Sequence, residues 1–169
     1  MGSVLFQEIR EFRSLAYSTS ASVNKRYYMD RDRYPTYLAA FIGTQGDKTI
    51  DAMTVLDSLI RHLPLSEKRL EMATKNIRSQ LITSYPSFRS VSSEMSANKR
   101  SNGFSRDYRE GDYPILDAMK LQDIEHYWNT QVAGRPIVWA VVGDPDKIGM
   151  ENLTRFGPVT QLKPEDVIK

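Results

Sequence analysis

The sequence contains no cysteine. A chain without cysteine cannot form a disulfide framework, a thiolate zinc site or a thiol nucleophile. This absence excludes those three classes of chemistry, but it does not identify the cellular compartment.

Long apolar stretches are absent as well. No segment approaches the roughly 18 consecutive apolar residues that a membrane-spanning helix needs. The chain also does not open with a charged segment followed by an apolar one, as a secretion signal does. We therefore expect a soluble fragment with no membrane partner. Its localisation, cytoplasmic or exported, stays open, since a signal could precede the residues shown.

Neither sign of charge dominates, because 23 basic residues face 21 acidic ones and the net charge is +2. Such a balance gives no strong electrostatic field, so we expect no nucleic-acid partner. The most basic stretch, 98–109, does mix basic and aromatic side chains, a pattern that single-stranded nucleic-acid binders also use. We interpret this stretch as a flexible charged connection.

At 169 residues the chain has the length of one domain and can bury a sizeable core. The spacing of apolar residues, with glycine and proline between the segments, predicts the elements. We expect helices at 3–13, 50–63, 67–85, 88–102, 114–119, 122–132 and 147–155, and strands at 15–23, 37–43, 137–143 and 159–162. Residues 104–113 are expected to form an irregular connection.

Two of these helices have clear start signals, since Asp47 can cap the first and Ser66 the second. The apolar stripe of the first consists of Ile50, Met53, Leu56, Ile60 and Leu63, and that of the second consists of Leu70, Ala73, Ile77 and Leu81. We expect the first stripe to face the core and the second helix to be the longest.

The run IVWAVVG at 137–143 is almost continuously apolar and rich in β-branched residues. This composition predicts a central strand that is buried on both faces. Helices outnumber strands, and the strands are unevenly spaced along the chain. The pattern therefore predicts an α+β fold with helices packed on one face of a sheet.

The most informative pair of residues is Arg10 and Tyr17, at a predicted helix-to-strand junction. The apolar residues have helical spacing around Arg10, and the residues around Tyr17 are typical of a strand. Because the backbone changes from helix to strand between the two residues, their side chains could converge on one spot. A guanidinium and a phenol would then offer two hydrogen-bond donors to one peptide carbonyl or developing oxyanion. On local pattern alone, a surface arginine and a half-buried strand tyrosine are the better explanation of the pair.

The phrase around this pair, MGSVLFQEIREFRSLAYSTSA, resembles the domain of pitrilysin and insulysin zinc metallopeptidases that does not bind zinc. Three further segments are similar to that family in the same order. They are YLAAFIGTQGDKTIDAM, LSEKRLEMATKNIRSQLITSYPSF and RPIVWAVVGDPDKIGMENLTRFGPVTQL. The resemblance covers nearly the whole chain.

The resemblance implies a mostly antiparallel sheet and a substrate-binding role for Arg10 and Tyr17, which would hold the scissile peptide. It implies a zinc-bearing partner domain, on the same chain or another, and a peptide substrate. Family domains usually begin before this phrase, so we expect residues 1–169 to lack the first strands and helix of the domain, and self-association is possible. A purely structural or inactive subunit-like domain is the alternative.

This chain alone is not expected to hold zinc or to hydrolyse peptides. The family's zinc motif, HxxEH, places two histidines and a glutamate on one helix. Glu125 precedes His126, but the second histidine of the motif is missing, and His62 stands at the end of a different predicted helix. We expect both histidines to be ordinary surface or core-edge residues, and we expect no cofactor in this chain.

Two other kinds of site find little support in the sequence. No serine lies in a glycine-flanked nucleophile elbow. The turn that contains Gly43, Gly46 and Asp47 faintly resembles a phosphate-binding turn before a helix. Neither a P-loop lysine pattern nor a dinucleotide fingerprint follows this turn, so we favour an ordinary turn.

Overall fold

The computed structural model describes residues 2–24, 36–102, 107 and 109–167. The chain forms two compact units whose segments alternate along the sequence. The first comprises Met1–Ser22, Leu38–His62 and Arg135–Lys169, and the second comprises Val23–Tyr37 and Leu63–Gly134. Among the described residues, helices combine with one two-stranded antiparallel sheet, so the chain is α+β, as predicted.

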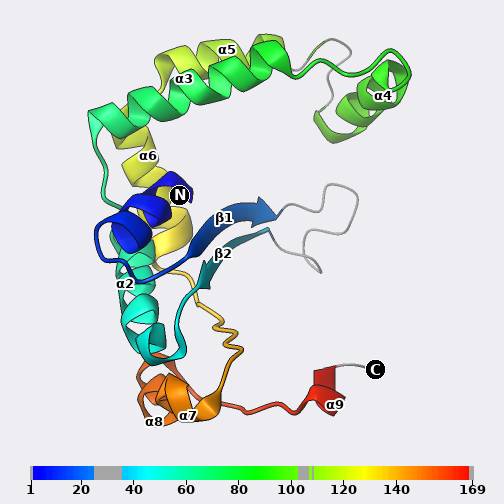
Figure 1. Cartoon of the computed structure of the whole chain (residues 1–169). Coiled ribbons are helices and arrows are strands. Elements are labelled where there is room, and N and C mark those ends of the chain that lie inside the picture. Colours follow the sequence, from blue (N-terminus) through cyan, green and yellow to red (C-terminus); the bar gives the residue numbers. More distant parts are fainter. Residues whose placement is uncertain (1, 25–35, 103–106, 108, 168–169) are drawn as a thin grey trace. The chain divides into compact units, whose positions relative to one another are not determined.

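The first unit contains most of the sheet and the helices at both ends of the chain (Figure 1). Its elements are α1 (Gly2–Leu5), the π-helical turn η1 (Phe6–Glu11), β1 (Ser18–Asn24), β2 (Tyr37–Gly43), η2 (Gly46–Lys48), α2 (Thr49–Arg61), α7 (Pro145–Ile148), α8 (Met150–Leu153), η4 (Thr154–Phe156) and α9 (Pro164–Val167). The second unit contains α3 (Glu67–Thr83), α4 (Val91–Asn102), α5 (Arg109–Ala118), α6 (Leu121–Trp128) and η3 (Asn129–Ala133).

Helix α2 supplies the core of the first unit. Its predicted apolar stripe is confirmed, because Met53, Leu56 and Ile60 are buried. Met53 packs in a cluster with Ile148 and Leu153 from α7 and α8. The predicted cap is wrong, however. Asp47 lies inside η2, and Lys48 occupies the first cap position without a side-chain hydrogen bond.

The predicted strand at 37–43 is confirmed as β2, and the predicted strand at 15–23 begins later, at Ser18. The predicted strands at 137–143 and 159–162 are wrong, since both segments lie outside regular structure. Val138 is 94% exposed and Val142 is 99% exposed. A strand needs a hydrogen-bonded neighbour, and among the described residues β1 and β2 pair only with each other.

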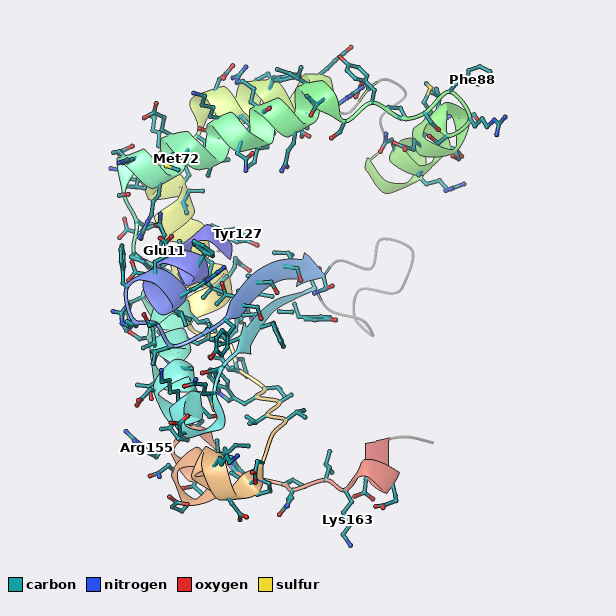
Figure 2. The ribbon with its side chains drawn as sticks, in the orientation of Figure 1. Glu11, Met72, Phe88, Tyr127, Arg155 and Lys163 are labelled. Atoms are coloured by element: carbon teal, nitrogen blue, oxygen red, sulfur yellow. The ribbon has the colours of Figure 1, made fainter. Side chains whose placement is uncertain are left out.

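In the second unit, α3 is the longest described helix, and the Ser66 side chain caps it by accepting a hydrogen bond from the Arg69 amide at 3.2 Å. Both features are as predicted. Its apolar stripe does not form a core, because α3 contains no buried residue. Met72 on this helix and Phe88 beyond its end are exposed apolar side chains (Figure 2).

Helix α5 begins at Arg109, five residues before the predicted start, and contains Pro114 in its interior. Asp107 explains the early start, since its carboxylate accepts a hydrogen bond from the Arg109 amide at 3.0 Å. The hydrogen bond from the Arg109 side chain also lowers the pKa of the Asp107 carboxyl. The bond therefore stabilises this helix start at pH values above the ordinary carboxyl pKa. Its contribution is lost as the pH falls and Asp107 becomes protonated. Residues 103–106 and 108 of the expected connection lie outside the described residues.

The remaining predicted helices are present with small changes. The helix expected at 88–102 begins at Val91, and the one expected at 122–132 runs through α6 into η3. The helix expected at 147–155 is divided at Gly149, whose φ of 72° lies in the left-handed region. In the described part of the chain, no helix is both long and apolar enough to span a membrane.

Candidate functional site

Arg10 lies on the π-helical turn η1, where one extra residue per turn widens the backbone. The Phe12 amide accordingly bonds to the Gln7 carbonyl, five residues earlier, at 2.9 Å. The guanidinium carbon of Arg10 lies 4.8 Å from the centre of the Phe6 ring. This cation–π contact orients the arginine while leaving its N–H groups available to a ligand.

Ser14 ends this turn in a left-handed conformation, with φ of 51°. Its amide bonds to the Arg10 carbonyl at 3.1 Å, and the Leu15 amide bonds to the Ile9 carbonyl at 3.0 Å. A left-handed residue that closes a helix in this manner reverses the chain direction. The reversal brings Tyr17 back beside the turn that carries Arg10.

Backbone groups of residues 15–17 are held by the last residue of β2 and the residue that follows it. The Tyr17 amide donates to the Gly43 carbonyl at 2.9 Å. The Thr44 hydroxyl donates to the Leu15 carbonyl. These bonds extend the pairing of β1 and β2 beyond the strand ends, so the position of Tyr17 is fixed by its own backbone.

Two side chains of the same turn also reach residues 14–17. The Gln45 amide nitrogen donates to the Tyr17 hydroxyl oxygen at 3.0 Å. The Lys48 ammonium lies 3.4 Å from the Ser14 carbonyl oxygen. Because the Tyr17 hydroxyl accepts from Gln45, its own proton remains free for donation to another acceptor.

Together these groups surround an open pocket with a volume of about 220 Å³. Its lining consists of Arg10, Ser14, Leu15, Ala16, Tyr17, Gln45 and Lys48. The sequence pattern suggested that Arg10 and Tyr17 could converge on one spot, and both line this pocket. Tyr17 is 70% exposed, so its hydroxyl is accessible from solvent.

Sequence reasoning missed Gln45 and Lys48 as members of this site. Their segment, GTQGDK, was interpreted only as a turn with a faint resemblance to phosphate-binding turns. The available signal was a lysine and a glutamine among the glycines of a tight turn before a helix. Such residues are common on protein surfaces, so the sequence alone does not single them out. Their contacts with Tyr17 and Ser14 become visible only in the folded structure.

The two histidines take no part in this pocket. His62 follows α2 at its C-terminal end, and His126 is exposed on α6. Within the described ranges, no group of three or more histidine, cysteine, aspartate or glutamate residues is arranged to hold a metal ion. The chemistry that the described pocket offers is hydrogen-bond donation and positive charge.

The chain was compared with models of protein families and with curated proteins. No family model matches the chain, and no curated protein matches it.

Proposed function

We propose that this chain is a non-catalytic substrate-binding domain of an insulysin-like zinc metallopeptidase. In this role it completes a peptide-binding chamber for a zinc-bearing partner domain, on the same chain or another. The observation that carries the proposal is that Arg10 and Tyr17 line one pocket and that both side chains are exposed. The family resemblance of the surrounding sequence supports the same role.

The geometry suits the binding of a peptide carbonyl. The Tyr17 hydroxyl keeps its proton for an acceptor because Gln45 supplies the hydrogen bond that the oxygen accepts. The Arg10 guanidinium adds donors from the facing turn. Preorganised donors of this kind stabilise negative charge that develops on a carbonyl oxygen during hydrolysis. Zinc, its activated water and the general base would belong to the partner domain.

The decisive experiment uses the chain together with its zinc-bearing partner and compares Tyr17→Phe with Tyr127→Phe. Tyr127 is an exposed tyrosine on α6 and serves as the matched control (Figure 2). Losing one well-aimed donor lowers kcat by about 10²-fold to 10³-fold. We expect that loss for Tyr17→Phe only, with zinc content and Tm near wild type.

Arg10→Lys tests the second donor, with Arg155→Lys as the control at another exposed arginine. A lysine keeps the positive charge but loses the planar fork, so turnover should fall for Arg10→Lys alone. The chain without its partner should hydrolyse nothing. If both site variants keep near-normal turnover, the proposal fails and the structural alternative, a domain with no role in peptide turnover, takes its place.

A further inference from the structure

The pocket holds more positive charge than a neutral carbonyl requires. Arg10 and Lys48 both line it, and no acidic residue is among the described residues that do. The described structure gives Lys48 no carboxylate partner, and its ammonium approaches only the Ser14 carbonyl, at 3.4 Å. Two cations that share a pocket without a counter-ion repel each other, and a bound anion relieves that repulsion.

The size and chemistry of the pocket limit what the anion is. A volume of about 220 Å³ lies below the range of about 300–1,000 Å³ that is typical of pockets for drug-sized ligands. There is therefore room for one terminal group of a larger ligand. A carboxylate accepts from a guanidinium and an ammonium at once, which matches Lys48 and those N–H groups of Arg10 that the carbonyl does not use, while the single Tyr17 proton stays with the carbonyl.

We infer that this pocket recognises a carboxylate of the bound peptide, and that Lys48 is the residue that selects it. The inference rests on the proposed function and narrows its substrate class to peptides that carry a carboxylate beside the bound carbonyl. That carboxylate is either the peptide C-terminus or the side chain of an aspartate or glutamate. Gln45 acts as a positioning residue, since its amide fixes the Tyr17 hydroxyl.

Four short peptides test the inference. Each peptide is titrated into the full chain, and the change in NMR chemical shifts of the protein measures its binding. Acetyl-Ala-Ala-Ala with a free C-terminus is compared with its C-terminal amide, and acetyl-Ala-Glu-Ala-amide with acetyl-Ala-Gln-Ala-amide. At low salt we expect one of the two carboxylate peptides to bind about 3-fold to 10-fold more tightly than its uncharged counterpart, as expected of an accessible ion pair. The pair that shows the preference identifies the source of the carboxylate.

Lys48→Gln should abolish this preference, and Lys48→Arg should retain it. Lys68→Gln is the matched control, because Lys68 is an exposed lysine in the first turn of α3 and does not line the pocket. The preference should also shrink as the ionic strength rises. The uncharged peptides should bind the Tyr17→Phe variant more weakly than the wild-type chain. This result would show that they occupy the pocket that contains Tyr17 and Lys48.

Equal binding of charged and uncharged peptides, or a preference that survives Lys48→Gln, would overturn the inference. The proposed function is decided separately by the turnover of the Tyr17→Phe variant, which does not depend on a carboxylate. A sharp loss of turnover without any carboxylate preference would therefore leave the peptidase proposal standing and remove only the selectivity assigned to Lys48.

Discussion

Ser14 carries the backbone strain on which the site depends. For a residue with a side chain, the left-handed backbone conformation costs roughly 1–2 kcal/mol of free energy. The cost is higher for a β-branched residue. The φ of 51° at Ser14 turns the chain between Arg10 and Tyr17, so the pocket requires this conformation.

Substitution of Ser14 tests this strain. Ser14→Val should lower the free energy of unfolding by about 1–3 kcal/mol, whereas Ser14→Gly should change it by less than about 1 kcal/mol. Urea unfolding measures both. Ser20→Val, at an exposed position of β1 where β-branched residues are favoured, is the control. Equal stability of the glycine and valine variants would show that this position is not strained.

At the residue scale, the sequence predicted part of the pocket. Arg10 and Tyr17 were identified because the phrase around them resembles a known family, and the change from helical to strand spacing between them allows their side chains to converge. Gln45 and Lys48 were not, since their place in the pocket depends on hydrogen bonds across the strand pair. Long-range pairing of this kind leaves no periodic signal in the sequence.

At the scale of elements, η2 and α7 approach each other closely at Gly46. A Cβ atom on Gly46 would lie 2.8 Å from the Cβ atom of Lys147, which is closer than such atoms pack. Because Gly46 stands between Gln45 and Lys48, the close approach helps to position both side chains of the pocket.

Gly46→Ala should therefore destabilise the chain by about 1–3 kcal/mol through overpacking. It should also weaken peptide binding, as the turn shifts away from α7. Gly134→Ala is the matched control, since a Cβ there meets nothing within 4 Å. Thermal unfolding and the peptide titration measure the two effects. If both variants behave alike, the contact between η2 and α7 does not constrain the turn.

The elements also show where sequence patterns suffice. Strand β2 was predicted with its observed bounds because Pro35 and Gly43 delimit a short apolar run. The run at 137–143 has a stronger strand composition, yet it forms none, since composition does not supply a pairing neighbour. The start of α5 was missed because Asp107, rather than Pro114, determines where the helix begins.

At the scale of the whole molecule, the small sheet is incompletely covered. A two-stranded sheet is marginally stable by itself, and unpaired strand edges recruit further strands. Phe41 on β2 is 59% exposed, and Val23 at the end of β1 is 57% exposed. This combination favours a second copy of the chain as a partner for the sheet.

We predict that the chain self-associates through β1 and β2 in a concentration-dependent manner, as measured by light scattering. Phe41→Lys should shift the equilibrium toward the monomer. Phe88→Lys should not, although Phe88 is 93% exposed, because it lies outside the sheet. A monomer at every concentration, or dispersal by Phe88→Lys alone, would contradict the prediction.

The hydrogen bonds around the pocket have a consequence for the order of folding. Those from Gln45, Thr44 and Lys48 join residues only 28, 29 and 34 positions apart. Closing these loops costs less chain entropy than forming the contact between Gly46 and Lys147, which lie much further apart in the sequence. We therefore expect the hydrogen bonds of the pocket to form when the β1–β2 hairpin closes, and the turn at Gly46 to be fixed afterwards, when α7 docks against it.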